Sequence, residues 1–198
     1  MDLATFLAFA VFVIVMTGTP GPGNLTFLAI GASAGYRTAF PVILASQVGY
    51  MPLALSVAYG LGTVMAGGGP VVTLFKVLSM TYMAYLAWRI ILLTVKPKGE
   101  VALPSFWEGV LIHPLSPKTW AMNLVAFSTF LAGNGLGLHE NALILMAGFS
   151  LGGLVFHSLW ALAGVSILKL IGEGPVMRVI TVVMAIAMLA ATVWAMAI

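Results

Sequence analysis

Two short proline-rich stretches contain most of the residues whose types and spacing could do chemistry. They are TPGPGN at residues 19–24 and HPLSPK at residues 113–118. A proline inside a helix removes a backbone donor and clashes with the carbonyl four residues before it, so neither stretch can be continuous helix. A helix that restarts after such a break presents free N–H groups and the positive end of its dipole. That arrangement suits a carboxylate ligand.

The chain that carries these stretches is too apolar to be soluble. Of its 198 residues, 62% are hydrophobic and 7% are charged, and the mean hydropathy is +1.13. Soluble domains have about 25% charged residues, which form their polar surface. The composition therefore excludes a soluble enzyme, a nucleic-acid-binding protein and a disordered regulator, and it predicts an integral membrane protein. Cysteine is absent, which excludes a disulfide or a cysteine-ligated metal.

Six apolar segments are long enough to span a membrane, which takes about 20 residues. The first segment lacks the basic start and the cleavage motif of a signal peptide, so we interpret it as a mature span. The proline-rich stretches fall inside the first and fourth segments, which are therefore predicted to be broken spans. We expect an all-α fold with a single transmembrane domain over residues 1–198. The six segments are 3–30, 39–66, 71–95, 106–131, 142–170 and 176–198.

The basic residues predict the orientation of these spans. Five of them lie in or beside the loops after spans one, three and five, with Arg89 slightly inside span three. Lys76 is alone on the other side. The positive-inside rule then places the odd loops in the cytoplasm and both termini outside. The five residues are Arg37, Lys96, Lys98, Lys169 and Arg178.

A weak internal repeat relates the two halves of the chain. Spans two and five align without gaps at an offset of 104, which pairs Ser46 with Ser150 and Gly49 with Gly153. With three spans each, the halves (approximately 1–95 and 104–198) would be inverted in the membrane, as in many secondary transporters. Glycine and serine recur in any helical membrane bundle, so packing alone is the alternative explanation.

Both breaks are predicted near the middle of the membrane. Each lies about ten residues from the cytoplasmic end of its span, or roughly 15 Å at 1.5 Å per residue. Two interrupted helices at one depth indicate a transport site, and the alternative is a pair of simple kinks. A lysine at this depth costs at least about 2.5 kcal/mol, so Lys118 should face a cavity, a partner or an anionic ligand. The alternative is that Lys118 extends toward the cytoplasm.

Other polar side chains inside the spans have both functional and structural interpretations. Asn24 and Asn123 are the amides nearest the breaks, where they could contact a solute or join helices. His157 lies in the middle of span five and is the candidate for proton coupling, although a single histidine also packs inside bundles. Tyr82 and Tyr85 are interpreted as aromatic packing residues.

The G-x-S-x-G pattern and the three histidines are not interpreted as catalytic or metal sites. The G-x-S-x-G pattern at 148–152 has no acidic residue near it, so we interpret Gly148 and Gly152 as a helix-packing face and not as a nucleophile elbow. The three histidines do not have metal-ligand spacing. Ser46, Gln47 and Tyr50 give span two a polar shoulder.

The broken spans resemble the lysine-exporter (LysE/RhtB) family of amino-acid translocators, over essentially the whole chain. The family has Pro-Gly-Pro-Asn in span one, where this chain has Pro20-Gly21-Pro22 followed by Gly23 and then Asn24. The family has Asn-Pro-Lys in span four, where this chain has Ser116-Pro117-Lys118. The resemblance implies a six-span inner-membrane exporter of amino acids or close derivatives, driven by the proton-motive force.

We therefore expect a secondary-active efflux transporter of the bacterial plasma membrane, without enzymatic activity, cofactor or metal. The spans hold no deep carboxylate to pair with a basic substrate, so neutral amino acids are favoured. The alternatives are a non-transporting membrane scaffold or assembly factor, and a small-anion transporter. A homodimer is a candidate assembly, and no nucleic-acid partner is expected. The expected substrate-binding residues are Pro20, Gly21, Pro22, Gly23, Asn24, Ser116, Pro117, Lys118 and Asn123, with His157 for proton coupling.

Overall fold

The computed structural model describes all residues except 63, 65–66, 96–103, 173 and 198. The described residues form helices and connecting turns, with no strand among them. The predicted cytoplasmic loop with Lys96 and Lys98 lies outside the described residues. The helices are α1 (Leu3–Gly18), α2 (Pro22–Ala34), α3 (Tyr36–Ser56), α5 (Pro70–Val95), α6 (Phe106–Leu111), α7 (Pro117–Ala126), α8 (Leu138–Ile171) and α9 (Pro175–Ala197), with π-helical turns η1 (Val57–Leu61) and η2 (Phe127–Leu131).

Among the described residues, four helical segments are long and apolar enough to cross a membrane. The consecutive helices α1 and α2 are bent by 51° at the first break and make a fifth span if they count as one. The predicted fourth span is divided into α6, α7 and η2, each too short to cross alone. The protein is thus an all-helical, multi-pass membrane protein. Helix length alone supports four or five spans.

Both predicted breaks are present in the structure, and each is followed by a helix that begins at a proline. α1 ends at Gly18, and α2 restarts with Pro22 as one of its first residues. α6 ends at Leu111, and α7 restarts with Pro117 in the same way. Proline is tolerated at this position because the first N–H groups of a helix have no intrahelical acceptor. The breaks therefore follow from the local sequence.

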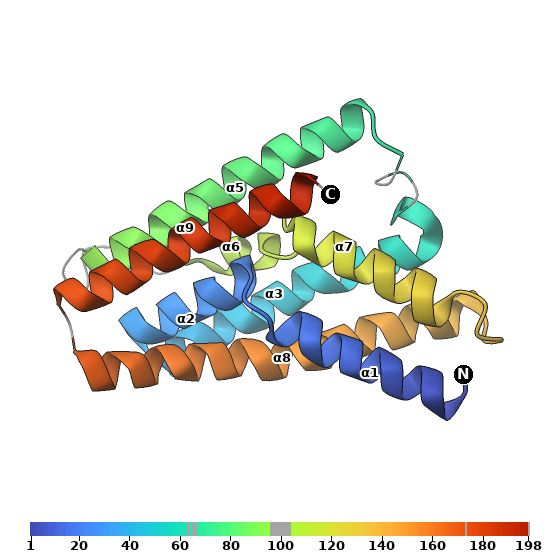
Figure 1. The fold of residues 1–198 in the computed structure, drawn as a ribbon, viewed down its shortest axis with the longest axis horizontal. Coiled ribbons are helices and arrows are strands. Elements are labelled where there is room, and N and C mark those ends of the chain that lie inside the picture. Colours follow the sequence, from blue (N-terminus) through green and yellow to red (C-terminus); the bar gives the residue numbers. More distant parts are fainter. Residues whose placement is uncertain (63, 65–66, 96–103, 173, 198) are drawn as a thin grey trace.

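Two apolar clusters hold the helices together, and the larger one lies between two groups of helices. Figure 1 shows α5 beside α9 on one side of the molecule, with α2, α3 and α8 on the other. Phe27 on α2, Ile43 on α3, Met83 on α5 and Met188 on α9 are all fully buried in the same cluster. This cluster joins the two groups and supports the helices that carry the polar residues described below.

The glycines of the G-x-S-x-G pattern are confirmed as a packing face. A Cβ at Gly148 would lie 2.9 Å from a ring carbon of Phe9, and one at Gly152 would lie 2.9 Å from Val13. Both neighbours belong to α1, so the two glycines let α8 approach α1 closely. This contact fixes the middle and the last turns of α1 against α8.

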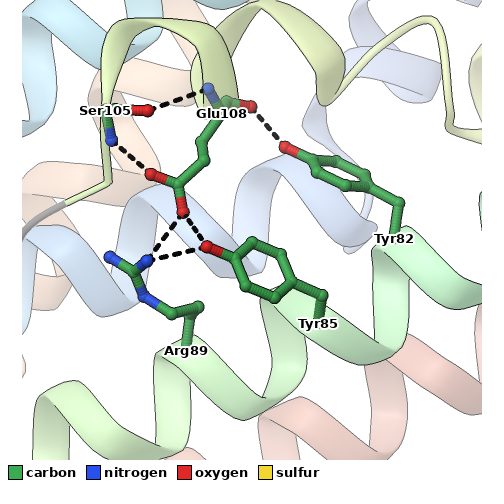
Figure 2. Close-up of polar contacts among 5 residues, drawn as sticks. All are labelled: Tyr82, Tyr85, Arg89, Ser105 and Glu108. Carbon is green, nitrogen blue, oxygen red and sulfur yellow. Dashed lines mark hydrogen bonds and ion pairs between the residues drawn. The ribbon is translucent and has the colours of Figure 1, made fainter.

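A polar cluster around Glu108 attaches α6 to α5 (Figure 2). The Glu108 carboxylate accepts hydrogen bonds from the Arg89 guanidinium at 2.9 Å and from the Tyr85 hydroxyl at 2.5 Å. The Tyr82 hydroxyl donates to the backbone carbonyl of Glu108. The interpretation of the two tyrosines as purely aromatic packing residues was incomplete, because both hydroxyls also donate to Glu108 on a different helix, α6. Glu108 also closes a capping box with Ser105 at the start of α6.

We expect Glu108→Ala to lower the free energy of unfolding by about 1–3 kcal/mol, because it removes the carboxylate to which Tyr85 and Arg89 both donate. The measurement is the midpoint of thermal unfolding in detergent. Glu140→Ala is the matched control, since Glu140 is an exposed acid in the first turn of α8 and should cost less than about 1 kcal/mol. Equal losses in the two variants would show that the cluster does not stabilise the α5–α6 contact.

Candidate functional site

A small cavity of about 40 Å³ lies where the two breaks meet. Its walls come from both breaks and from α1, α2, α3, α7 and α8, and most of its polar groups are on different helices. At roughly 10–15 Å³ for each water, the cavity has room for about three water molecules. A larger solute therefore fits inside the cavity only if the walls move apart. The polar lining residues are Thr17, Asn24, Gln47, Tyr50, His113, Ser116, Lys118, Thr119 and His157.

The Lys118 side chain joins the second break to the first. Its ammonium donates to the Thr19 carbonyl at 3.0 Å, the Thr19 hydroxyl at 2.8 Å and the Pro20 carbonyl at 3.3 Å. Gly21 permits this approach, since a Cβ there would lie 3.0 Å from the lysine stem. The three acceptors are uncharged oxygens, so they satisfy the N–H donors without neutralising the positive charge. Lys118 thus keeps an unneutralised charge at the wall of the cavity.

Asn24 closes the first break from the other side. Its Nδ2 donates to the carbonyls of Thr17 and Thr19, each at 2.8 Å. These carbonyls lie at and just beyond the last turn of α1, where no helical N–H follows to satisfy them. Asn24, in the first turn of α2, therefore replaces the missing backbone donors and holds α1 and α2 in their bent arrangement.

His157 lies against a second histidine inside the cavity wall. The rings of His157 and His113 are stacked, with centroids 5.2 Å apart and planes 23° apart. Gln47 Nε2 lies 3.4 Å from His157 Nδ1, and Thr119 Oγ1 lies 3.4 Å from His113 Nδ1. The described residues contain no group of three or more potential metal ligands. The two imidazoles are the titratable rings of a polar, buried cluster.

Asn123 lies behind the cavity wall. It is fully buried and is not part of the lining. Its Oδ1 accepts from the Tyr50 hydroxyl at 2.8 Å, and its Nδ2 donates to the Thr119 carbonyl at 2.8 Å. Both ends of the amide are occupied, so in this conformation Asn123 positions Tyr50, which does line the cavity.

An apolar groove of about 420 Å³ lies on the other side of Lys118, between α1, α7 and α9. Pro20 and Pro117 line this groove and not the polar cavity. Lys118 lines both spaces, so its stem and ammonium form part of the wall between them. The predicted residues that line the polar cavity are Gly21, Pro22, Gly23, Asn24, Ser116, Lys118 and His157.

Further polar residues that were not predicted at the site line the cavity, including Gln47, Tyr50, His113 and Thr119. Gln47 and Tyr50 belong to the polar shoulder of span two, and this polar pair in an apolar span was the feature of the sequence that could have predicted their place at the site. His113 opens the second break and was considered only as a metal ligand. Each of these residues reaches the cavity through helix packing, which the sequence pattern does not specify.

The profile of the LysE type translocators matches residues 12–196, which include both breaks and all the lining residues. The chain belongs to the LysE translocator family. LysE proteins are transporters and not enzymes, so the cavity is a transport-site candidate. The resemblance inferred from the residues around the two breaks is confirmed.

Among similar proteins are the cysteine/O-acetylserine efflux proteins of Escherichia coli strain K12 and of Shigella flexneri, each 30% identical over 125 residues. The corresponding protein of Escherichia coli O1:K1 / APEC is 29% identical over the same length. The match covers 62% of this LysE-family chain and 64% of each relative, which is less than two thirds of the relative's length. No solved structure matches this chain.

Proposed function

We propose that this LysE-family protein is a secondary-active exporter of amino acids or close derivatives, with neutral ones favoured, in the bacterial plasma membrane. The observation that carries the proposal is the unneutralised Lys118 ammonium at the junction of the two breaks. The similar efflux proteins, whose names specify cysteine and O-acetylserine, support the same substrate class. The proposed partners are the substrate and the lipid bilayer, with a homodimer as the candidate assembly and no nucleic acid.

In the proposed mechanism, the substrate carboxylate replaces the backbone oxygens that Lys118 now contacts. α2 and α7 both begin at the breaks, and the first N–H groups of each helix have no intrahelical acceptor. These N–H groups and the helix dipoles favour an anion at the same place. Lys118 then alternates between holding the breaks together when empty and holding the carboxylate when loaded. The other candidate residues, from Pro20 to Asn24, Ser116, Pro117 and Asn123, shape or support this site.

The proposed topology has six spans, with α1 and α2 as the first and α6, α7 and η2 as the fourth. Each half, approximately 1–95 and 104–198, then contains one broken span, and the halves are inverted relative to each other. Both termini lie outside the cell in this topology. Rocking of one half against the other would enlarge the cavity and expose it to alternate sides.

Counterflow into proteoliposomes tests the proposed function. Vesicles loaded with a mixture of unlabelled amino acids should take up labelled neutral amino acids at least about tenfold faster than protein-free vesicles. Basic amino acids should be taken up less, because no deep carboxylate is present to pair with them. A scaffold protein would exchange none of them. A small-anion transporter would exchange inorganic anions but no amino acid.

Proton coupling is proposed at His157, whose ring stacks on His113 beside Lys118 and Tyr50 in the cavity lining. A pH gradient, acidic outside, should drive wild-type export against a substrate gradient. His157→Gln should retain counterflow but lose this concentrative export, because glutamine keeps a hydrogen-bonding group without an exchangeable charge. His139→Gln is the control, since His139 is exposed and contacts Tyr59 away from the cavity. Normal concentrative export by His157→Gln would place coupling elsewhere.

A further inference from the structure

Two buried amide oxygens of the cavity-lining residues have no hydrogen-bond partner among the residues that the structure describes. They are Asn24 Oδ1 and Gln47 Oε1. Asn24 is 4% exposed and Gln47 is 5% exposed, and both residues line the cavity. Buried acceptors without a donor are destabilising and are rare in folded proteins. Two of them from different helices, at one cavity, therefore indicate a site for a group that donates.

The orientation of the Asn24 amide follows from its neighbours. Its nitrogen donates to two carbonyls, those of Thr17 and Thr19, which can only accept. A flipped amide would place oxygen against both carbonyl oxygens, so Oδ1 must be the free end. Gln47 Nε2 lies 3.4 Å from His157 Nδ1, and when that ring nitrogen is unprotonated it accepts from the amide, which leaves Oε1 as the free end.

The donor that fits two neutral oxygens is an ammonium group, which has several N–H donors and no acceptor. Lys118 lines the same cavity and favours an anionic group, because its own ammonium attracts a carboxylate. An α-amino acid zwitterion carries both groups on one carbon. Uncharged amide oxygens suit its ammonium, since the charge of that ammonium is already balanced by the adjacent carboxylate.

We propose that Asn24 and Gln47 form the subsite for the substrate α-ammonium, with Lys118 as the subsite for the carboxylate. This inference rests on the proposed export function and adds the rule by which substrates are chosen. The two subsites recognise the α-ammonium and the carboxylate of an amino acid and make no contact that selects its side chain. Substrates modified on the side chain are therefore accepted, and substrates modified on the α-amine are rejected. In the empty protein each of the two amide oxygens exposes less than 1 Å², so the substrate reaches them only once the cavity walls move apart.

Two isomers with the same atoms test this rule. O-acetyl-L-serine has a free α-ammonium, and N-acetyl-L-serine has the acetyl group on that nitrogen. Binding is measured on protein in detergent as the ligand-dependent rise in the unfolding midpoint, in mildly acidic buffer that prevents migration of the acetyl group. O-acetylserine should bind at least about 100-fold more tightly, because acetylation of the amine removes its charge and leaves one N–H donor for two acceptor oxygens. Equal binding of the isomers, or binding of neither, would overturn the subsite.

Variants of Gln47 connect the selectivity to the proposed residues. Gln47→Met removes the amide and retains its length, and it should reduce the discrimination between the isomers at least tenfold. Gln47→Glu retains an acceptor oxygen and should keep the preference for the free amine. Asn134→Ala is the matched control, because Asn134 is an amide bonded to Asn141 outside the cavity. Unchanged discrimination in Gln47→Met would contradict the assignment.

Binding and transport separate the two proposals. If O-acetylserine binds selectively but wild-type vesicles exchange no amino acid, the export function is wrong and the ammonium subsite stands. If vesicles exchange amino acids while both isomers bind equally, the export function stands and the ammonium subsite is wrong.

Discussion

Lys118→Met should reduce counterflow of neutral amino acids by about 10- to 150-fold while the protein remains folded. Hydrogen bonds to a charged group contribute about 1.5–3 kcal/mol, and each 1.4 kcal/mol is a factor of ten. Methionine keeps an unbranched stem of similar length beside Gly21 and Met122, so the packing between cavity and groove is largely retained. The measurement is the initial rate of counterflow per folded protein, with folding checked by size exclusion in detergent.

Two controls distinguish the loss of a carboxylate partner from a loss of structure. Lys118→Arg keeps a positive charge and should retain more exchange than Lys118→Met. Lys76→Met removes an exposed lysine that bonds the Met196 carbonyl, and it should leave exchange unchanged. If Lys118→Met exchanged amino acids at the wild-type rate, Lys118 would have no role in transport. Loss of folded protein in Lys118→Met alone would support the scaffold alternative, with Lys118 as a structural tie between the breaks.

Gly31→Val should prevent accumulation of folded protein, with a loss of more than about 3 kcal/mol of stability. A Cβ at Gly31 would lie 2.0 Å from the Ala161 carbonyl oxygen, and one at Gly164 would lie 2.0 Å from the Leu28 carbonyl oxygen. The obstructing atoms belong to the backbones of α8 and α2, so a rotamer change cannot relieve the clash. The crossing also carries the site, because Asn24 is on α2 and His157 is on α8.

The matched control for the helix crossing is Gly174→Val. No atom of the described residues outside its immediate neighbours lies within 4 Å of a Cβ at Gly174. This variant should express and elute as wild type. The measurement is the yield of monodisperse protein in detergent together with the unfolding midpoint. Equal yield and equal midpoint for Gly31→Val and Gly174→Val would mean that α2 and α8 do not cross as closely as described.

Features that depend on local covalent structure and on composition were predicted from the sequence. The apolar composition predicted a membrane protein, and the prolines around residues 20 and 117 predicted two broken helices, because a missing N–H interrupts a helix in any fold. The motif residues at the same breaks predicted the family. The length of segment 106–131 also predicted a spanning segment, but the structure divides it into three short helices, and its status as one span remains a proposal.

The tertiary structure alone decided how the polar residues meet. His157 and Gln47 are 110 positions apart, and Lys118 is 99 positions from Thr19, so no periodicity within one helix could pair them. Asn123 was predicted at the ligand, but its Oδ1 accepts from the Tyr50 hydroxyl of α3, and Tyr50 lines the cavity while Asn123 does not. The sequence by itself determined the class of protein, the positions of the breaks and the family, because prolines and apolar runs act locally. Which side chains share the cavity, and which acceptors stay unpaired there, depends on helix crossings that only close packing of distant segments defines.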